Sequence, residues 1–233
     1  MASILIVNDQ SLQRLGLRML LTAQPDLTVV GEAATGAEAV RLSAALRPDV
    51  VLMATSSPGA DGIEAIRRIT RPVRLLPDAP DSAGAVRLPP RVLVLASTTH
   101  EGHAPAALRA GAGGFLLDNA GLDQLTAAIR VVAAGDAVIT PGLTRALIDA
   151  VRQPRTPHPV ERHTGSDSFT GRERDVLLAV ASGWSNAEIA ARLSIAPTTV
   201  KSHVSHILAK LHARSRVQAV TYAYESGLVR PAA

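Results

Sequence analysis

The first half of the chain alternates short apolar runs with segments in which apolar residues recur every three or four positions. The runs are rich in Val, Ile and Leu and lack polar alternation, as is typical of strands covered on both faces. The expected strands are residues 4–7, 29–32, 50–53, 92–96 and 115–117. The expected helices between and after them are residues 11–23, 36–46, 62–70, 103–110 and 121–134. Five strand–helix repeats predict a five-stranded parallel sheet with helices on both faces.

The carboxyl ends of these strands are the expected place for function, because ligands of open parallel sheets bind at that edge. The residue pairs that follow or end four of the strands are Asn8-Asp9, Ala54-Thr55, Ser97-Thr98 and Asp118-Asn119. We expect any site in this half of the chain to include them.

One long stretch interrupts the strand–helix pattern, and two further segments follow the pattern. Residues 71–90 hold five prolines and no clear period, which predicts a long loop before the fourth strand. Thr140-Pro141 is typical of a helix N-cap, so a helix is expected to about Arg152. Residues 153–168 hold three prolines and predict a flexible linker. The expected organisation is a domain over 1–135, a linker helix and linker over 136–167, and a second domain over 168–233.

The second domain has the capping residues that are typical of short helices. Three capping boxes are expected, at Thr170 with Glu173, Ser185 with Glu188, and Ser215 with Gln218. Gly183 and Gly227 stand where helix C-caps would fall, and another helix is expected from Pro197 to about Leu211. The pattern predicts four short helices, with a helix-turn-helix over residues 185–211.

The helix expected at 197–211 has two distinct faces. At 100° per residue, one arc holds Val200, Val204, Ile207, Leu208 and Leu211. The nearly opposite arc holds Thr198, Lys201, Ser202, Ser205 and Ala209. The first arc suits packing on the other helices. The second is polar, with small side chains and one cation, which suits entry into the major groove of DNA, although a solvated face would show the same pattern.

Charge is distributed unevenly along the chain. Residues 1–152 hold 14 Arg, no Lys and 14 acidic residues, whereas residues 168–233 hold 6 Arg, 2 Lys and 4 acidic residues. The formal charge of +4 therefore belongs to the second domain. A neutral domain joined to a small basic one favours a regulatory domain that carries a nucleic-acid binder, while a basic tail without function would give the same balance.

Composition removes several other classes of protein. The chain has no cysteine, which excludes a disulfide scaffold, thiolate zinc sites and cysteine nucleophiles. The longest apolar runs are too short to span a bilayer, and the N-terminus lacks the pattern of a secretory signal. We therefore expect a cytoplasmic protein. No catalytic motif is present, and His100 with His103 lacks a third ligand, so neither an enzyme, a metal site nor a cofactor is expected.

Dense motifs run through residues 169–230, namely Thr170-x-Arg-Glu, Ser185-Asn186-x-x-Ile-Ala, Thr199-Val200-Lys201-x-His203-Val204 and Lys210-Leu211. With them this part resembles a LuxR-type DNA-binding domain. Residues 5–9, 47–53 and 110–117 are similar to the receiver domain of NarL/FixJ-type response regulators. The resemblance implies a flavodoxin-like, doubly wound receiver followed by an all-α LuxR-type helix-turn-helix domain. It thus implies a two-component response regulator that regulates transcription by binding specific sites on double-stranded DNA.

Receivers of that family accept a phosphoryl group on an aspartate at the end of the third strand. Acidic residues hold Mg²⁺, and a hydroxyl and a lysine contact the phosphoryl group. The matching positions here are Asn8, Asp9, Ala54, Ala96 with neighbouring Ser97, and Asp118. Ala54 has no nucleophile and Asp118 reverses the charge of the lysine. The resemblance therefore implies an atypical receiver that aspartyl phosphorylation does not switch.

Two alternatives to that interpretation stay open. A displaced acceptor would leave a conventional phosphorylation-switched regulator; one candidate is Asp61, in the loop expected seven residues past Ala54. The chain would otherwise be an interaction partner that sequesters other regulators without binding DNA. The volume left by Ala54 also offers room for a small-molecule or protein ligand.

The resemblance also implies which residues meet DNA. They are Lys201, Ser202, Ser205, Thr198, Thr199, Ser185, Asn186, His206, Lys210, Arg214 and Arg216. Lys201 is the expected contact to guanine or phosphate, and helix N-terminal amides are expected to meet phosphates. His203 is expected to pack rather than to read a base. Ala196 stands where the family often has Ser, so this helix lacks an N-cap side chain.

The last expected helix, about 216–226, has Val217, Val220 and Tyr224 at spacings of three and four. In domains of this type it often pairs two copies on a palindromic site. We therefore expect a homodimer with half-sites about one helical turn apart. The alternative is that these residues complete the local core.

Overall fold

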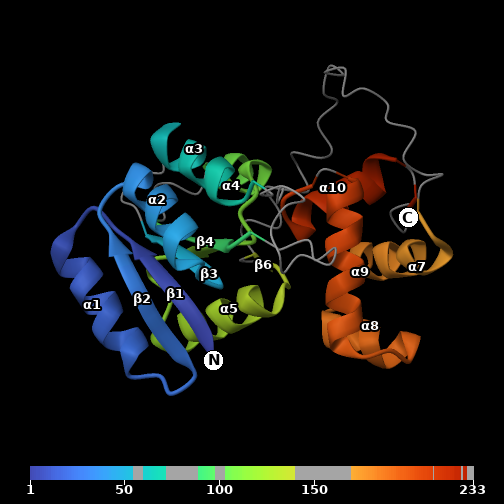
Figure 1. The fold of residues 1–233 in the computed structure, drawn as a ribbon, viewed down its shortest axis with the longest axis horizontal. Coiled ribbons are helices and arrows are strands. Elements are labelled where there is room, and N and C mark those ends of the chain that lie inside the picture. Colours follow the sequence, from blue (N-terminus) through green and yellow to red (C-terminus); the bar gives the residue numbers. More distant parts are fainter. Residues whose placement is uncertain are drawn as a thin grey trace, which may run out of the picture.

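The computed structural model describes residues 1–54, 60–71, 89–97, 103–139, 169–211, 213–226 and 228–229. Two domains lie side by side in it, with a sheet and its helices in one and only helices in the other (Figure 1). The long loop expected at 71–90 lies almost wholly outside the described residues. The helix expected at 140–152, the linker at 153–168 and the C-cap at Gly227 lie outside them too.

The N-terminal domain contains a fully parallel sheet. Its strands are β1 (Ala2–Val7), β2 (Leu27–Ala33), β3 (Val50–Ala54), β4 (Arg91–Ala96), β5 (Gly114–Leu117) and β6 (Val138–Ile139). Their order in the sheet is β2-β1-β3-β4-β5-β6. The five expected strands are confirmed. The sixth, two residues beside β5, was not expected, because so short a segment carries no periodic signal.

Helices cover both faces of this sheet (Figure 1). On one face α2 (Gly36–Leu46), α3 (Ala60–Ile69) and α4 (Ala104–Ala110) pack on a core that includes Leu5, Val51 and Phe115. On the other, α1 (Ser11–Thr22) and α5 (Leu122–Ala134) pack on a core that includes Ile4, Leu52 and Leu93. Since strand residues are buried on both faces, the strands show no polar alternation. Burial of each large side chain contributes about 1.5–3 kcal/mol.

The start of α3 differs from the expected one. The helix begins at Ala60, so Asp61 lies in its first turn rather than in a preceding loop. An acidic residue is favourable there because of the helix dipole. The other helices of this domain begin and end within one residue of their expected limits.

The C-terminal domain consists of α7 (Gly171–Ala181), α8 (Asn186–Leu193), α9 (Pro197–Lys210) and α10 (Arg216–Glu225). The four helices expected from the sequence are confirmed. Two of the expected capping boxes form: Thr170 with Glu173, and Ser185 with Glu188. Gly183 follows α7 with a φ of 86°, as a left-handed C-cap glycine does.

The third expected capping box is wrong. Ser215 precedes α10, but its buried hydroxyl has no hydrogen-bond partner among the described residues. The Oε1 of Gln218 instead accepts from the backbone N–H of Arg214 at 2.6 Å, and its Nε2 donates to the carbonyl of Arg109 at 2.8 Å. The side chain that should have closed the box is therefore used in a contact with the N-terminal domain.

No helix in the described part of the chain combines the length and apolar character needed to cross a bilayer.

Candidate nucleic-acid interface

Helices α8 and α9 are joined by a tight turn. Ser194 ends α8 in the left-handed conformation, with φ of 52°, and Pro197 starts α9. The N–H of Ile195 bonds back to the carbonyl of Ala190 at 3.0 Å, and Arg172 from α7 donates to the carbonyl of Leu193 at 2.5 Å. These bonds hold the two helices in a helix-turn-helix arrangement.

The apolar face of α9 packs as its sequence predicts. Val200, Val204 and Ile207 are buried in one core with α7 and α10, and Leu208 and Leu211 pack against that core. This face fixes the rotation of α9, so the opposite polar face points away from the domain.

The polar face of α9 is largely exposed. Thr198, Lys201, Ser202 and Ala209 are exposed and Ser205 is half-buried. The hydroxyls of Ser202 and Ser205 donate to carbonyls one turn earlier, at 3.2 and 2.7 Å. Thr199 and His206 are also exposed, while His203 is half-buried beside the core. The face presents small polar side chains and one cation, which suits the major groove.

The start of α9 lacks a side-chain cap. Ala196 occupies the N-cap position with extended backbone, φ −68° and ψ 146°, and has no capping oxygen. We expect Ala196→Ser to stabilise the C-terminal domain by about 0.5–1 kcal/mol, because a hydroxyl there accepts from an orphan N–H of the first turn. Urea unfolding followed by the fluorescence of Trp184 measures this change. A midpoint equal to or below that of the wild type would contradict it.

Lys210 at the end of α9 is bound within its own domain. Its Nζ donates to Oε2 of buried Glu173 at 2.6 Å and lies 6.0 Å from the ring centroid of Phe169. Burial raises the pKa of the Glu173 carboxyl, but the hydrogen bonds from Lys210 and Thr170 outweigh it, so this pKa lies below its usual value. Lys210 thus ties α9 to the capping box of α7.

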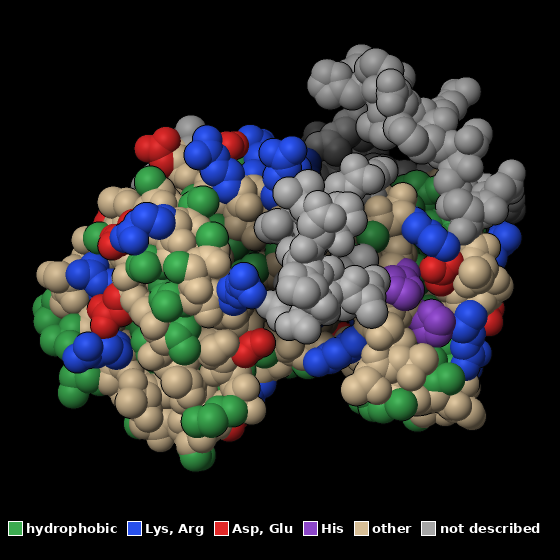
Figure 2. Space-filling view, viewed as in Figure 1, with side chains coloured by type: hydrophobic (Ala, Val, Ile, Leu, Met, Phe, Trp, Pro, Cys, Tyr) green, Lys and Arg blue, Asp and Glu red, His purple; other side chains and the backbone are tan. Residues whose placement is uncertain are grey.

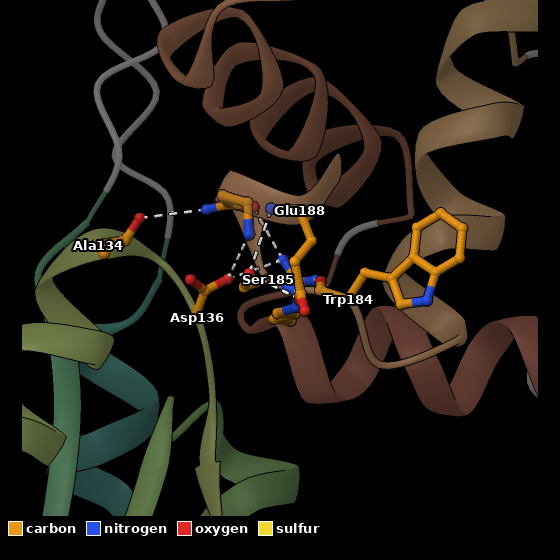
Figure 3. A network of polar contacts seen from close by, with 7 residues as sticks. Ala134, Asp136, Trp184, Ser185 and Glu188 are labelled. Carbon is orange, nitrogen blue, oxygen red and sulfur yellow. Dashed lines mark hydrogen bonds and ion pairs between the residues drawn. The ribbon is translucent and has the colours of Figure 1, made fainter. Parts of the chain in front are cut away.

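The N-terminus of α8 contacts the other domain (Figure 3). Oδ1 of Asp136, two residues after α5, accepts from the backbone N–H of Asn186 at 3.2 Å and lies 3.2 Å from NH1 of Arg216. The side-chain amide of Asn186 donates to the carbonyl of Ala134 at 3.2 Å. Burial lowers the pKa of the Arg216 guanidinium, and the charge of Asp136 partly opposes that effect.

Gly135 allows this close approach. It ends α5 with φ of 99°, a conformation that favours glycine. A Cβ atom there would lie 2.9 Å from the guanidinium of Arg91 and 3.4 Å from the amide of Asn186. A side chain at position 135 would therefore press on both sides of the domain contact.

Part of the polar face of α9 looks into a hollow between the domains. Lys201, Ser205 and Ala209 line it from α9, and Arg214 and Arg216 line it from the segment before and the start of α10. The N-terminal domain contributes Arg91, Gly111 and Asp136, among others. Five residues expected to contact DNA therefore line this hollow: Lys201 and Ser205 on α9, together with Asn186, Arg214 and Arg216.

The residues of α10 divide between the two domains. Val217 packs against the core of the N-terminal domain, while Val220 packs within its own domain. Tyr224 is 37% exposed, and its hydroxyl donates to the carbonyl of Ala181 at 3.4 Å. Only Val220 completes the local core in the way the sequence allowed.

The carboxyl edge of the sheet gathers the expected receiver positions. Ala54 ends β3 beside Leu95 of β4, and Ala96 ends β4 beside Leu117 of β5. The N–H of Asp118 donates to the carbonyl of Ala96 at 2.9 Å. Ala54 and Ala96 are buried, Ser97 is half-buried, and Asp9 and Asp118 are exposed.

The side chain of Asn8, also at this edge, is hydrogen-bonded to its neighbours through both its amide nitrogen and its oxygen. Its Oδ1 accepts from the N–H of Gln10 at 2.6 Å, and its Nδ2 donates to Gln13 at 3.1 Å. Only 1% of Asn8 is exposed, so it acts as a buried bridge into α1.

Comparison with known proteins decides the family. Residues 4–130 match the response regulator receiver domain, and residues 167–223 match the luxR family of bacterial regulatory proteins. The chain is 34% identical over 224 residues to the nitrate/nitrite response regulator protein NarL of Escherichia coli strain K12, across 96% of this chain and 95% of NarL. This chain belongs to the LuxR family of response regulators.

Other relatives of this LuxR-family regulator agree. It is 34% identical to the transcriptional regulatory protein LiaR of Bacillus subtilis strain 168, across 98% of this chain and all of LiaR. A LuxR-family response regulator from Aurantimonas sp. SI85-9A1 aligns with 64% of the chain and 96% of its own, at 31% identity and TM-score 0.51. The structure of the RcsB–DNA complex aligns over 98% of this chain and 99% of its own, at 21% identity and TM-score 0.50, a likeness of fold.

Our LuxR-family regulator therefore has a receiver followed by a DNA-binding helix-turn-helix domain. The structure brings Lys201 and Ser205 to one hollow with Asn186, Arg214 and Arg216, although Asn186 and Arg216 are buried rather than exposed. Asp136 was not anticipated as a functional residue. It follows a helix-ending glycine, and nothing near it in the sequence indicates a partner fifty residues away.

Proposed function

We propose that this LuxR-family regulator binds specific DNA sites to control transcription, and that aspartyl phosphorylation does not switch its receiver. The claim about phosphorylation rests on the residue that ends β3. Ala54 closes that strand at the carboxyl edge of the sheet, between the strands that end at Val7 and Ala96. A methyl group there supplies no nucleophile for phosphoryl transfer.

The polar face of α9 supports DNA binding. Lys201 and the small residues around it present donors that fit base edges, while the apolar face anchors the helix. A relative of similar fold, RcsB, has a structure described as a complex with DNA. The proposal includes contacts to DNA by Thr198, Thr199, Ser202 and His206.

The residues at the carboxyl edge are poorly suited to Mg²⁺, which the receivers of this family use. Mg²⁺ takes oxygen ligands, usually carboxylates. Ala54 offers none, and the Asn8 side-chain oxygen already accepts the 2.6 Å bond from Gln10. Asp9 is the single carboxylate that directly follows β1.

Acetyl phosphate with Mg²⁺ is expected to leave the full-length protein unmodified. Ala54 lacks a carboxylate, and Asp118 places negative charge where a lysine would draw the phosphoryl group in. Intact mass spectrometry measures the adduct, with a receiver that has an aspartate acceptor treated alongside as the positive control. A phosphoryl adduct on residues 1–135 that hydroxylamine removes would identify a displaced acceptor, such as Asp61, and would overturn this part of the proposal.

We also propose that the regulator acts as a homodimer. Leu12, Leu15 and Met19 form an exposed stripe at helical spacing along α1, with exposures of 80%, 43% and 66%. Figure 2 shows hydrophobic side chains gathered at the end of the molecule where α1 lies. A second copy of the chain would cover such a stripe, as exposed apolar patches commonly mark interfaces. The ligand considered for the space beside Ala54 stays a prediction.

A further inference from the structure

The N-terminus of α8 holds an anion that comes from the other domain. The carboxylate of Asp136 receives the backbone N–H of Asn186 at 3.2 Å and faces the guanidinium of Arg216 at 3.2 Å (Figure 3). The side chain of Arg216 is 8% exposed and that of Asp136 is 18% exposed. A charged pair this well buried needs directed hydrogen bonds to be stable.

Hydrogen bonds within the C-terminal domain help to orient the donors of this site. Arg216 donates to Oδ1 of Asn186 at 3.0 Å and to the carbonyl of Trp184, which sets the direction of the guanidinium. The capping box uses the N–H of Glu188 but leaves the N–H of Asn186, in the first turn, for an external acceptor. The C-terminal domain therefore contributes the donors of an anion site, and Asp136 of the N-terminal domain contributes the anion.

The position of the site points to DNA phosphate as its natural ligand. A helix N-terminal amide combined with an arginine is a common phosphate-binding arrangement. Lys201 and Ser205, on the face of α9 assigned to DNA, line the same hollow as Asn186, Asp136 and Arg216. In helix-turn-helix domains the helix before the recognition helix crosses the phosphate backbone.

We propose that the amide of Asn186 and the guanidinium of Arg216 form a subsite for a DNA backbone phosphate, and that Asp136 occupies this subsite as a phosphate mimic. The inference rests on the proposed DNA-binding function and adds a means of regulating it. On DNA binding, a backbone phosphate then replaces the Asp136 carboxylate at the N-terminus of α8. Any interaction that stabilises the Asp136 contact therefore lowers the affinity for DNA. Because affinity and domain contact are linked, DNA also separates the two domains.

The test is duplex binding by the full-length wild type and the variant Asp136→Asn across a series of salt concentrations. The variant is expected to bind roughly fivefold or more tightly at low salt, within the usual range of such couplings. It is also expected to steepen the salt dependence by about one unit of slope, since the variant brings one more net positive charge to the phosphate backbone. Asp136→Glu keeps the charge and is expected to stay close to the wild type.

The matched control is Asp123→Asn, which removes one negative charge from the exposed first turn of α5. It is expected to leave affinity and slope near the wild-type values. Equal affinity and slope in Asp136→Asn and the wild type would overturn the inference while leaving DNA binding intact. Tighter binding without a steeper slope would show that Asp136 only holds the domains together, and would overturn the phosphate subsite. No duplex binding by any of these proteins would instead reject the proposed function.

A second measurement uses the wild type and does not depend on the folding of a variant. The backbone amide resonance of Asn186 is expected to shift when duplex DNA replaces the Asp136 carboxylate as its acceptor. An Asn186 resonance that stays unchanged in the DNA complex would overturn the inference.

Discussion

Lys201→Ala is expected to weaken binding of the full-length protein to its specific duplex about fivefold to 150-fold, equivalent to ~1–3 kcal/mol. Lys201 is the one cation on the exposed polar arc of α9, whose opposite face is held by Val200 and Val204. The substitution removes charge and donors from the groove without touching the core. Fluorescence anisotropy with a labelled duplex measures the loss.

The control for this loss is Arg174→Ala, which removes one exposed positive charge from α7. It is expected to change affinity by less than the α9 variant. Comparison of specific with random duplex separates two roles of Lys201. A base contact is lost only on the specific site, whereas a phosphate contact is lost equally on both. Unchanged affinity for both duplexes would remove Lys201 from the interface.

Glu173→Gln is expected to destabilise the C-terminal domain by about 1–2 kcal/mol. Hydrogen bonds to charged groups contribute about 1.5–3 kcal/mol, and the lower part of that range applies because Lys210 is partly exposed. The buried carboxylate joins the cap of α7 to the end of α9, through Thr170 and Lys210. Urea unfolding followed by the fluorescence of Trp184, the chain's single tryptophan, reports on this domain.

The contact between Glu173 and Lys210 also predicts how the stability of the domain depends on pH. Because the pKa of Glu173 is lower in the folded domain than the ordinary value of 4.5, the stabilisation by its carboxylate is complete above pH 4.5 and is lost as pH falls through the folded pKa. The wild-type midpoint should therefore fall more steeply below about pH 4.5 than that of Glu173→Gln. Asp175→Asn, on the exposed side of α7, is the control and should follow the wild type. Parallel pH profiles for all three proteins would contradict the account.

Much of the fold could be predicted from the sequence because its signals are local. The strand Ile4 to Val7 is apolar at every position, and the structure buries it on both faces. The two faces of α9 follow from helical periodicity alone, so Val200 and Lys201 point in different directions as expected. The positions at the carboxyl edge, Ala54 and Ala96 among them, follow from strand order in a parallel sheet.

The remainder depends on pairings between residues that are far apart in sequence. Gln218 has the spacing of a capping box with Ser215, yet its amide reaches Arg109 in the other domain. Arg216 was expected to attract DNA from the surface, but it is buried between Asp136 and Asn186. Neither the contact of Gln218 with Arg109 nor the burial of Arg216 is indicated by a pattern in the sequence, because both arise where the two domains meet.

The most direct test of the central claim is selection of genomic DNA fragments by the full-length wild-type protein, with and without acetyl phosphate and Mg²⁺. We predict that the protein enriches a discrete set of paired half-sites, with an affinity that falls as salt rises. We further predict that the phosphodonor alters neither the sites nor the affinity. Enrichment that appears only with acetyl phosphate, or no enrichment under either condition, would contradict a DNA-binding regulator that works without aspartyl phosphorylation.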